Sequence, residues 1–181
     1  MSVSWTSHSI SQIIDYLKNE HDEFRTKDLY TLSELFVQCE KEMSIHGEPF
    51  KELLTYYHDF KTRFLSHMEE EEDFLFPKIL RTDASAHNPE LYPEVYKGSV
   101  NMYPTTMLHS SDAEFTEMIS SLVSKAEKIN SDLSSKAKLS HLLLALKDYR
   151  DKIHAHAIVE GEVLIPRAKK LEDEIKKRLH G

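Results

Sequence analysis

Two short stretches of the chain place a histidine four residues before a glutamate. They are His67 with Glu71 in HMEEEEDFLFP, and His156 with Glu160 in HAIVEGEVLIP. Residues four apart are neighbours on one face of a helix, so each imidazole and carboxylate can point at a common centre. Imidazole and carboxylate donors suit iron, manganese or zinc, whereas metals that prefer soft ligands favour sulfur. The spacing therefore predicts that both stretches bind metal.

The two stretches belong to an internal repeat. The histidine, the glutamate and a following proline, Pro77 in one copy and Pro166 in the other, all recur at an offset of 89 residues. A further histidine precedes each copy: His21 lies 46 residues before the first motif, and His109 lies 47 residues before the second. The chain therefore resembles two copies of one helical hairpin, with a histidine on the first helix and His-x-x-x-Glu on the second.

Packing the two hairpins together brings four histidines and two glutamates into one apolar interior. Burial of these polar groups without partners is costly, and two divalent cations would relieve the cost. We expect Glu71 and Glu160 to bridge the two ions and the imidazoles to fill terminal positions, because bundle cores hold dinuclear sites of this kind. Six ligands for two ions leave positions open for oxide, hydroxide or a diatomic molecule. The predicted metal ligands are His21, His67, Glu71, His109, His156 and Glu160.

Helices must position these residues. Capping residues, breakers and apolar spacing predict four helical segments, at 9–43, 49–81, 104–129 and 134–179, with Ser7 or Ser9 as the first N-cap. The stretch 82–98 is a loop by composition, and 130–132 is a turn. We expect an all-α fold, an antiparallel four-helix bundle of two repeated hairpins, in a single domain over residues 1–181.

The second and fourth segments carry inward-facing residues at alternating steps of four and three, a set of positions here called the seam. In a regular α-helix this alternation continues past each glutamate. It therefore places Phe74 on the seam of the second segment and Val163 on the seam of the fourth.

Other polar residues are expected to lie off the seam. The acidic run at 69–73 contains one seam residue, and the others form a solvated face. His58 and His154 point in other directions than the ligands, although a supporting role behind the metal ligands stays open for His154. His46 sits in a turn as a cap or surface residue. The single cysteine, Cys39, is expected to be a small buried residue.

Composition excludes several classes of protein. The chain has 23 Lys and Arg against 31 Asp and Glu, a formal net charge of −8, so nucleic acid and anionic membranes are not expected partners. No apolar stretch approaches the roughly 20 residues that a membrane span needs. No secretory signal is evident at the N-terminus, and one cysteine provides neither a disulfide framework nor a cysteine-rich metal site. We expect a cytoplasmic, acidic, helical protein.

The residues around the predicted ligands resemble the hemerythrin-like, or HHE, cation-binding family, and within it the di-iron proteins that repair iron–sulfur clusters. The resemblance covers nearly the whole chain and is carried by IIDYLKNEHDEF, IHGEP, HMEEEEDFLFP, MLHSSDAEF and HAIVEGEVLIPRA. It matches His21, His67, His109 and His156 to the family's four histidine ligands. It matches Glu71 and Glu160 to the two bridging carboxylates.

The resemblance implies an oxo- or hydroxo-bridged centre of two iron ions, with manganese or zinc as alternatives. It also implies a role in nitrosative and oxidative stress, with NO or O2 as ligands and damaged iron–sulfur proteins as partners in repair. Ala113 stands where the oxygen-carrying hemerythrins have a further histidine, which disfavours an oxygen carrier. A sensor or store that binds O2, NO or iron without turnover remains an alternative, as does a peroxidase or NO reductase, because the same ligands serve all of them.

Overall fold

The computed structural model describes residues 5–43, 48–88, 90, 105, 110–132 and 137–180, and nearly all of these residues are helical. A 3-10 turn, η1 (Trp5–Ser7), precedes the first rod, which consists of α1 (Ile10–Glu23), η2 (Phe24–Asp28) and α2 (Leu29–Met43). The second rod consists of α3 (Glu48–Glu70), η3 (Glu71–Leu75) and α4 (Phe76–His87). The third is α6 (Ser110–Asp132), and the fourth consists of α7 (Ala137–Ile158), η5 (Val159–Leu164) and α8 (Ile165–His180).

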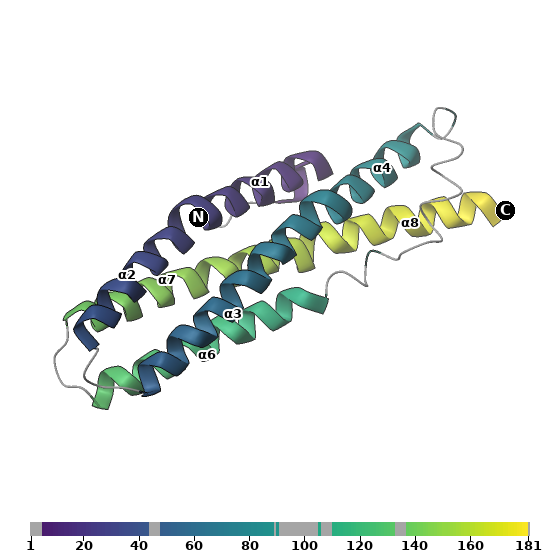
Figure 1. Cartoon of the computed structure of the whole chain (residues 1–181). Helices are drawn as coiled ribbons and strands as arrows, with labels where there is room; N and C mark the ends of the chain where they lie inside the picture. Colours follow the sequence, from purple (N-terminus) through teal and green to yellow (C-terminus); the bar gives the residue numbers. More distant parts are fainter. Residues whose placement is uncertain are drawn as a thin grey trace.

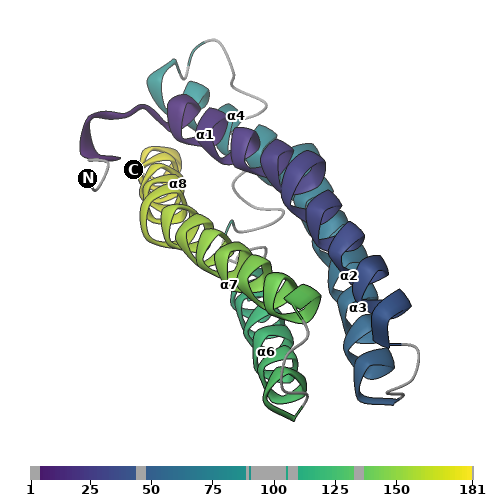
Figure 2. The same cartoon turned by 90° about the vertical axis from the view of Figure 1, so that its left-hand side faces the viewer.

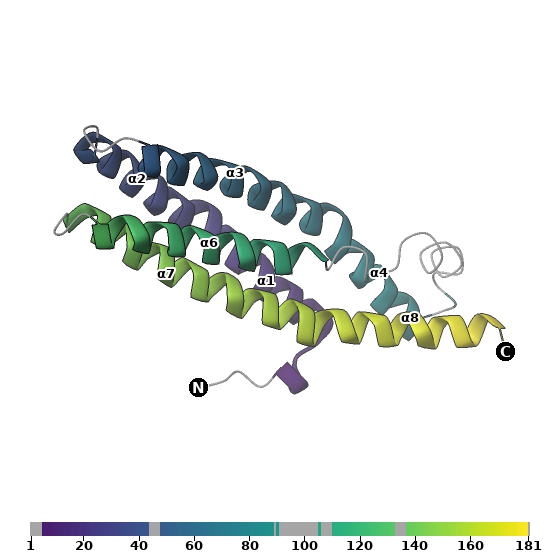
Figure 3. The same cartoon turned by 90° about the horizontal axis from the view of Figure 1, so that it is seen from below.

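The four rods lie lengthwise beside one another and form a bundle (Figures 1 and 3). At one end α2 packs on α3 and α7, and α6 packs on both α3 and α7, so these four helices form a closed ring. At the other end α4 contacts α1 and α8. Figure 2 shows the first two rods side by side, with α6 and the α7–α8 rod next to them. Among the described residues, no helix has both the length and the apolar character that crossing a membrane requires.

The first helix begins at a reciprocal cap, which confirms one of the two expected N-cap residues. Gln12 donates its backbone N–H to Ser9 Oγ at 3.2 Å, and the Ser9 backbone donates to Gln12 Oε1 at 2.8 Å. The residues before the cap are held by the fourth rod, because Arg167 donates hydrogen bonds to the carbonyl oxygens of Trp5 and His8.

Helices extend beyond the ends expected from the sequence. The second rod continues to His87, so the part of the expected 82–98 loop up to His87 is helical instead. Packing against α8 explains the extension, because Thr82 and Ser85 are buried there and satisfy their hydroxyls on carbonyl oxygens one turn earlier. The turn expected at 130–132 is also wrong, because α6 runs through Asp132. Residue 89 and residues 91–104 lie outside the described part.

Three segments, η2, η3 and η5, are π-helical, and this shifts the register of the chain. At their ends the backbone N–H groups of Leu29, Phe76 and Ile165 each donate to the carbonyl oxygen five residues earlier. The η3 and η5 segments occupy equivalent places in the two copies of the repeat.

The extra residue in each π segment turns the following side chains away from the seam. The placement of Phe74 and Val163 inside is therefore wrong. Phe74 is 65% exposed and Val163 is only partly buried, whereas Leu75 and Leu164 occupy the inside instead.

The hydrophobic core has two large clusters along the bundle, and a small third one around Ala86 and Ile175. One cluster joins α2, α3, α6 and α7 and includes Cys39, which is buried as expected. The other joins α1, η3, α4, η5 and α8. On the first rod His21 lies between Leu17 of one cluster and Phe24 of the other, and the histidine–glutamate pairs interrupt the second and fourth rods in the same way. The five predicted ligands that the structure describes thus lie in a polar layer between two apolar clusters.

Candidate metal centre

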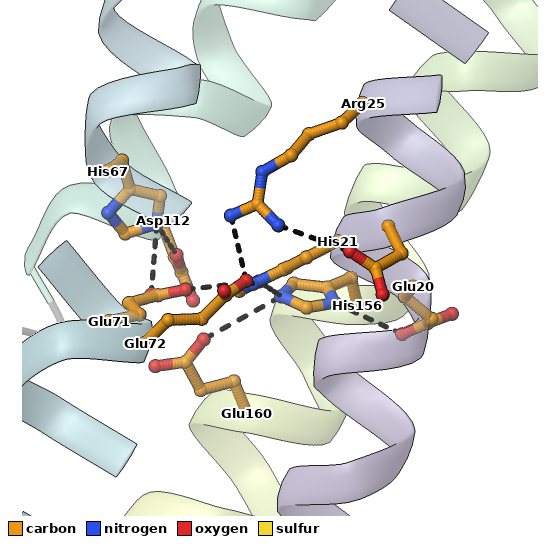
Figure 4. A network of polar contacts seen from close by, with 10 residues as sticks. Glu20, His21, Arg25, His67, Glu71, Glu72, Asp112, His156 and Glu160 are labelled. Carbon is orange, nitrogen blue, oxygen red and sulfur yellow. Dashed lines mark hydrogen bonds and ion pairs between the residues drawn. The ribbon is translucent and has the colours of Figure 1, made fainter. Parts of the chain in front are cut away.

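Five of the six predicted ligands converge in this polar layer (Figure 4). His21 comes from α1, His67 from α3 and His156 from α7, while the two glutamates come from the π segments η3 and η5. All five side chains are buried. The sixth predicted ligand, His109, lies outside the described residues.

Glu71 stands between two histidines and offers one carboxylate oxygen to each. Its Oε1 lies 3.0 Å from Nε2 of His67, and its Oε2 lies 3.2 Å from Nε2 of His21. This carboxylate belongs to two groups of potential metal ligands. His21, Glu71 and His156 form one group, and His67, Glu71 and Asp112 form the other. Within each group, the ligand atoms lie within 4.8 Å of one another. One carboxylate shared by two groups of donors is the arrangement that a bridging ligand of two ions requires.

The first group brings two imidazole nitrogens unusually close together. Nε2 of His21 and Nε2 of His156 are 3.2 Å apart. Two nitrogens bound to one ion at about 2.1 Å, at right angles to each other, would be separated by about 3.0 Å. The observed spacing therefore fits a shared cation.

Carboxylates behind these two histidines determine which ring nitrogen faces the centre. His21 Nδ1 lies 2.8 Å from Oε1 of Glu72, and His156 Nδ1 lies 3.0 Å from Oε2 of Glu20. An ionised carboxylate only accepts hydrogen bonds, so both Nδ1 atoms carry a proton, and in the neutral form of each ring Nε2 presents a lone pair inward. Carboxylates in this position commonly orient metal-binding histidines.

Glu72 corrects the expectation that all of the acidic run except Glu71 is solvated. It is partly buried, and besides His21 it holds Arg25, whose Nη2 donates to Glu72 Oε1 at 2.7 Å. Burial raises the pKa of Glu72, but the hydrogen bonds from Arg25 and His21 outweigh it and lower that pKa. The residue therefore stays ionised as an acceptor for His21.

Asp112 is a member of the site that sequence reasoning missed. It is buried on the first turn of α6, and its Oδ1 lies 2.8 Å from Nε2 of His67. The available signal was its position three residues after His109 in the sequence, a spacing that would put both residues on one face of the helix expected at 104–129.

Glu160 lies at the edge of the centre. Its Oε2 is 3.8 Å from Nε2 of His156, and both of its oxygens are buried and accept no hydrogen bond from the described residues. Burial raises the pKa of Glu160 well above its usual value, and the nearby carboxylates of Glu71 and Asp112 raise it further. The oxygens of Glu71 likewise have close imidazole neighbours but no hydrogen bond of ordinary geometry.

The charged groups at the centre shift one another's pKa values. Burial lowers the pKa of His67, yet its contacts with Asp112 and Glu71 raise that pKa to about 10. Burial raises the pKa of Glu71, but its contacts with His21 and His67 bring it well below the usual range. The protonation state of each group therefore depends on the charge of its neighbours.

The donor set fits a metal centre. Three buried carboxylates meet three buried imidazoles, and two of these imidazoles aim lone pairs at each other. Cations would neutralise the carboxylates, occupy the space between the nitrogens and satisfy the buried oxygens. All donors are nitrogen or oxygen, which suits iron, manganese or zinc.

The remaining histidines take no part in the centre as far as the structure describes them. His58 and His154 are exposed, as expected from their direction on the helices. Because the His154 side chain is exposed, it does not support the metal ligands from behind. His46 lies outside the described residues.

The structure therefore defines an all-helical bundle protein with buried groups of histidine, glutamate and aspartate that could hold a metal ion. No protein-family model matches the chain, and the comparison with curated proteins found no match.

Proposed function

We propose that the protein is a non-haem di-iron protein of the hemerythrin-like kind, which binds NO or O2 in defence against nitrosative and oxidative stress and repairs damaged iron–sulfur clusters. The observation that carries the proposal is the position of Glu71, with one carboxylate oxygen at His21 and the other at His67. A single metal site would need only one of these contacts.

The repeated sequence supports the hemerythrin-like arrangement of the bundle. In both copies a histidine–glutamate pair lies at a π segment that a proline follows. The two copies pack together through the contacts among α2, α3, α6 and α7. Two hairpins packed antiparallel would bring the equivalent residues of both copies to one level of the bundle. Glu160 would then be the counterpart of Glu71 and bridge from the opposite side.

Each protein group has a definable task at such a centre. Glu71 would hold both ions, while His21 and His156 would bind one of them and His67 and Asp112 the other. Glu72 and Glu20 orient the imidazoles, and the two apolar clusters exclude water above and below. When bound, the iron ions would supply one-electron redox chemistry and open positions for a diatomic ligand.

Metal analysis of anaerobically purified protein tests the proposal. Native protein should retain two equivalents of iron, and Glu71→Gln should retain less than one because both ions lose a ligand. Glu70→Gln is the matched control, since Glu70 is exposed next to it in the chain and should leave the iron content unchanged. Two equivalents retained by Glu71→Gln would refute the shared-carboxylate centre.

Function is tested with the iron-loaded protein. Under reducing conditions it should restore activity to a [4Fe–4S] enzyme damaged by NO, and Glu71→Gln should not. Reversible uptake of NO or O2 without restoration would identify a sensor or store, and multiple turnovers of NO or hydrogen peroxide would identify a redox enzyme. Either result would replace cluster repair as the proposed function while leaving the metal centre in place.

A further inference from the structure

Tyr149 on α7 carries a buried hydroxyl that no described residue satisfies. The side chain is 1% exposed, and its oxygen has no hydrogen-bond partner among the described residues. Tyr57 shows the contrast, because its equally buried hydroxyl lies 2.8 Å from Ser33 Oγ and donates to the Leu29 carbonyl oxygen at 3.1 Å. Burying an unsatisfied hydroxyl costs free energy that phenylalanine would avoid, so the Tyr149 oxygen calls for an explanation.

Aromatic rings connect Tyr149 to both halves of the candidate metal centre. The Tyr149 ring centroid is 5.5 Å from that of Phe24, which is in turn 5.5 Å from the His156 ring. On the other side Tyr149 is 6.3 Å from Phe64, which is 6.2 Å from His67. One phenylalanine ring therefore separates the phenol from a predicted ligand in each direction, a short path for an electron.

Asp28 adds a negative charge to the surroundings of the same phenol. Its Oδ1 accepts from Lys152 Nζ at 2.8 Å, whereas its Oδ2 is buried and has no hydrogen-bond partner among the described residues. Burial raises the pKa of Tyr149 well above its usual value, and the negative charge of Asp28 raises it further. The phenol is thus protonated at neutral pH, and loss of an electron must be accompanied by transfer of its proton.

We propose that Tyr149 is a one-electron donor to the metal centre and that it loses its phenolic proton in the same step. The inference rests on the proposed di-iron function and applies when hydrogen peroxide meets a centre with a single Fe(II) left. One peroxide is reduced to two waters: Fe(II) gives one electron and becomes Fe(III), and Tyr149 gives the other and becomes a neutral tyrosyl radical. The O–O bond and the Tyr149 O–H bond break. The proton of Tyr149 and one proton from solvent complete the two waters.

The experiment is freeze-quench electron paramagnetic resonance of protein loaded with two equivalents of iron, poised with one Fe(II) and mixed with hydrogen peroxide. Native protein should give a radical signal that narrows when the tyrosine rings are deuterated. Tyr149→Phe should abolish the signal, and Tyr57→Phe should keep it.

Two further readouts separate this donor role from a structural one. Tyr149→Phe should bind iron as the native protein does, and its thermal midpoint in the metal-free form should be unchanged or higher, because it loses only an unsatisfied hydroxyl. A loaded native protein without a tyrosyl radical, or a Tyr149→Phe variant that keeps it, would overturn the inference but not the metal centre. Native protein that binds no iron would overturn the proposed function itself.

Discussion

The Nε2 atoms of His21 and His156 lie 3.2 Å apart, although 135 residues separate the two histidines along the chain. Carboxylates hold the far side of both rings, so each inward nitrogen presents a lone pair. Such a pair is repulsive until a proton or a cation lies between the two nitrogens. The packing of the helices therefore holds the two nitrogens at a spacing that favours metal binding.

Replacing one of these histidines should remove the stabilisation that metal provides. A ligand at 100 times its dissociation constant stabilises the folded state by about 2.7 kcal/mol, and His156→Gln should lose most of that gain. His154→Gln is the control, because His154 is exposed two residues away and should retain the gain. Thermal unfolding with and without Fe2+ or Zn2+ measures the difference. Equal stabilisation of both variants would contradict the assignment of His156.

The carboxylates behind the histidines should tune affinity without being ligands. Glu72→Gln and Glu20→Gln should each weaken metal binding about 10- to 100-fold, because the imidazole loses its fixed orientation. Competition with a chromophoric chelator measures the affinity, and exposed Glu23→Gln serves as the reference substitution. If Glu72→Gln and Glu23→Gln bound metal equally well, the contact with His21 would have no part in the site.

Asp112 should matter for one ion more than for the other. Asp112→Asn removes a donor from the group that contains His67 and leaves the group of His21 and His156 intact. We expect one equivalent of metal to stay tightly bound and the second to become weak, as measured by stepwise calorimetric titration. Glu117→Gln, an exposed change on the same helix, should preserve both binding steps. Equal weakening of the two steps would show that Asp112 does not belong to one ion.

Stability of the metal-free protein should fall as the pH rises. The pKa of His67 is raised from 6.5 to about 10, and the pKa of Glu160 is also raised, so the folded state binds more protons than the unfolded state at pH 6.5 to 10. By linkage the free energy of unfolding then decreases with pH over this window.

We expect a loss of at least about 1 kcal/mol between pH 6.5 and 9 in urea denaturation with a chelator present. Bound Zn2+ should flatten the dependence, because the ion replaces the protons. A metal-free protein that becomes more stable over the same interval would show that these groups are not buried as described.

The helices, the repeat and the burial of five predicted ligands in one layer could be predicted because each depends on local spacing. The π segments could not, because a regular α-helical period was assumed past each glutamate, and Phe74 was therefore placed inside. Pro77 and Pro166 held a partial signal: proline lacks a backbone donor and crowds the preceding turn, which favours a wider helix. No proline accompanies η2, so that segment depends on packing alone. Asp112 and Glu72 were missed because their roles depend on contacts with other helices.

The widened turn in the second rod can be tested by removing it. Deleting Phe74 together with Pro77→Ala should restore a regular α-helix and keep the register on both sides, because Phe74 is exposed. We expect the helical circular dichroism and the thermal midpoint to persist while metal content falls, since Glu71 loses its position. Deleting exposed Thr62 from the regular part of α3 should instead unfold the protein, because the side chains after the deletion would rotate away from the core relative to those before it. Undiminished metal content after loss of Phe74 would show that the π segment does not position the centre.

The polar layer that separates the two apolar clusters has a thermodynamic consequence. Without cations, we expect the adjoining acidic groups to weaken the junction, so that each end of the bundle can melt as a separate cooperative unit. Occupancy would join the ends into one calorimetric transition. Loss of the metal would then act at a distance, by loosening the contacts among α1, α4 and α8 at one end of the bundle and among α2, α3, α6 and α7 at the other.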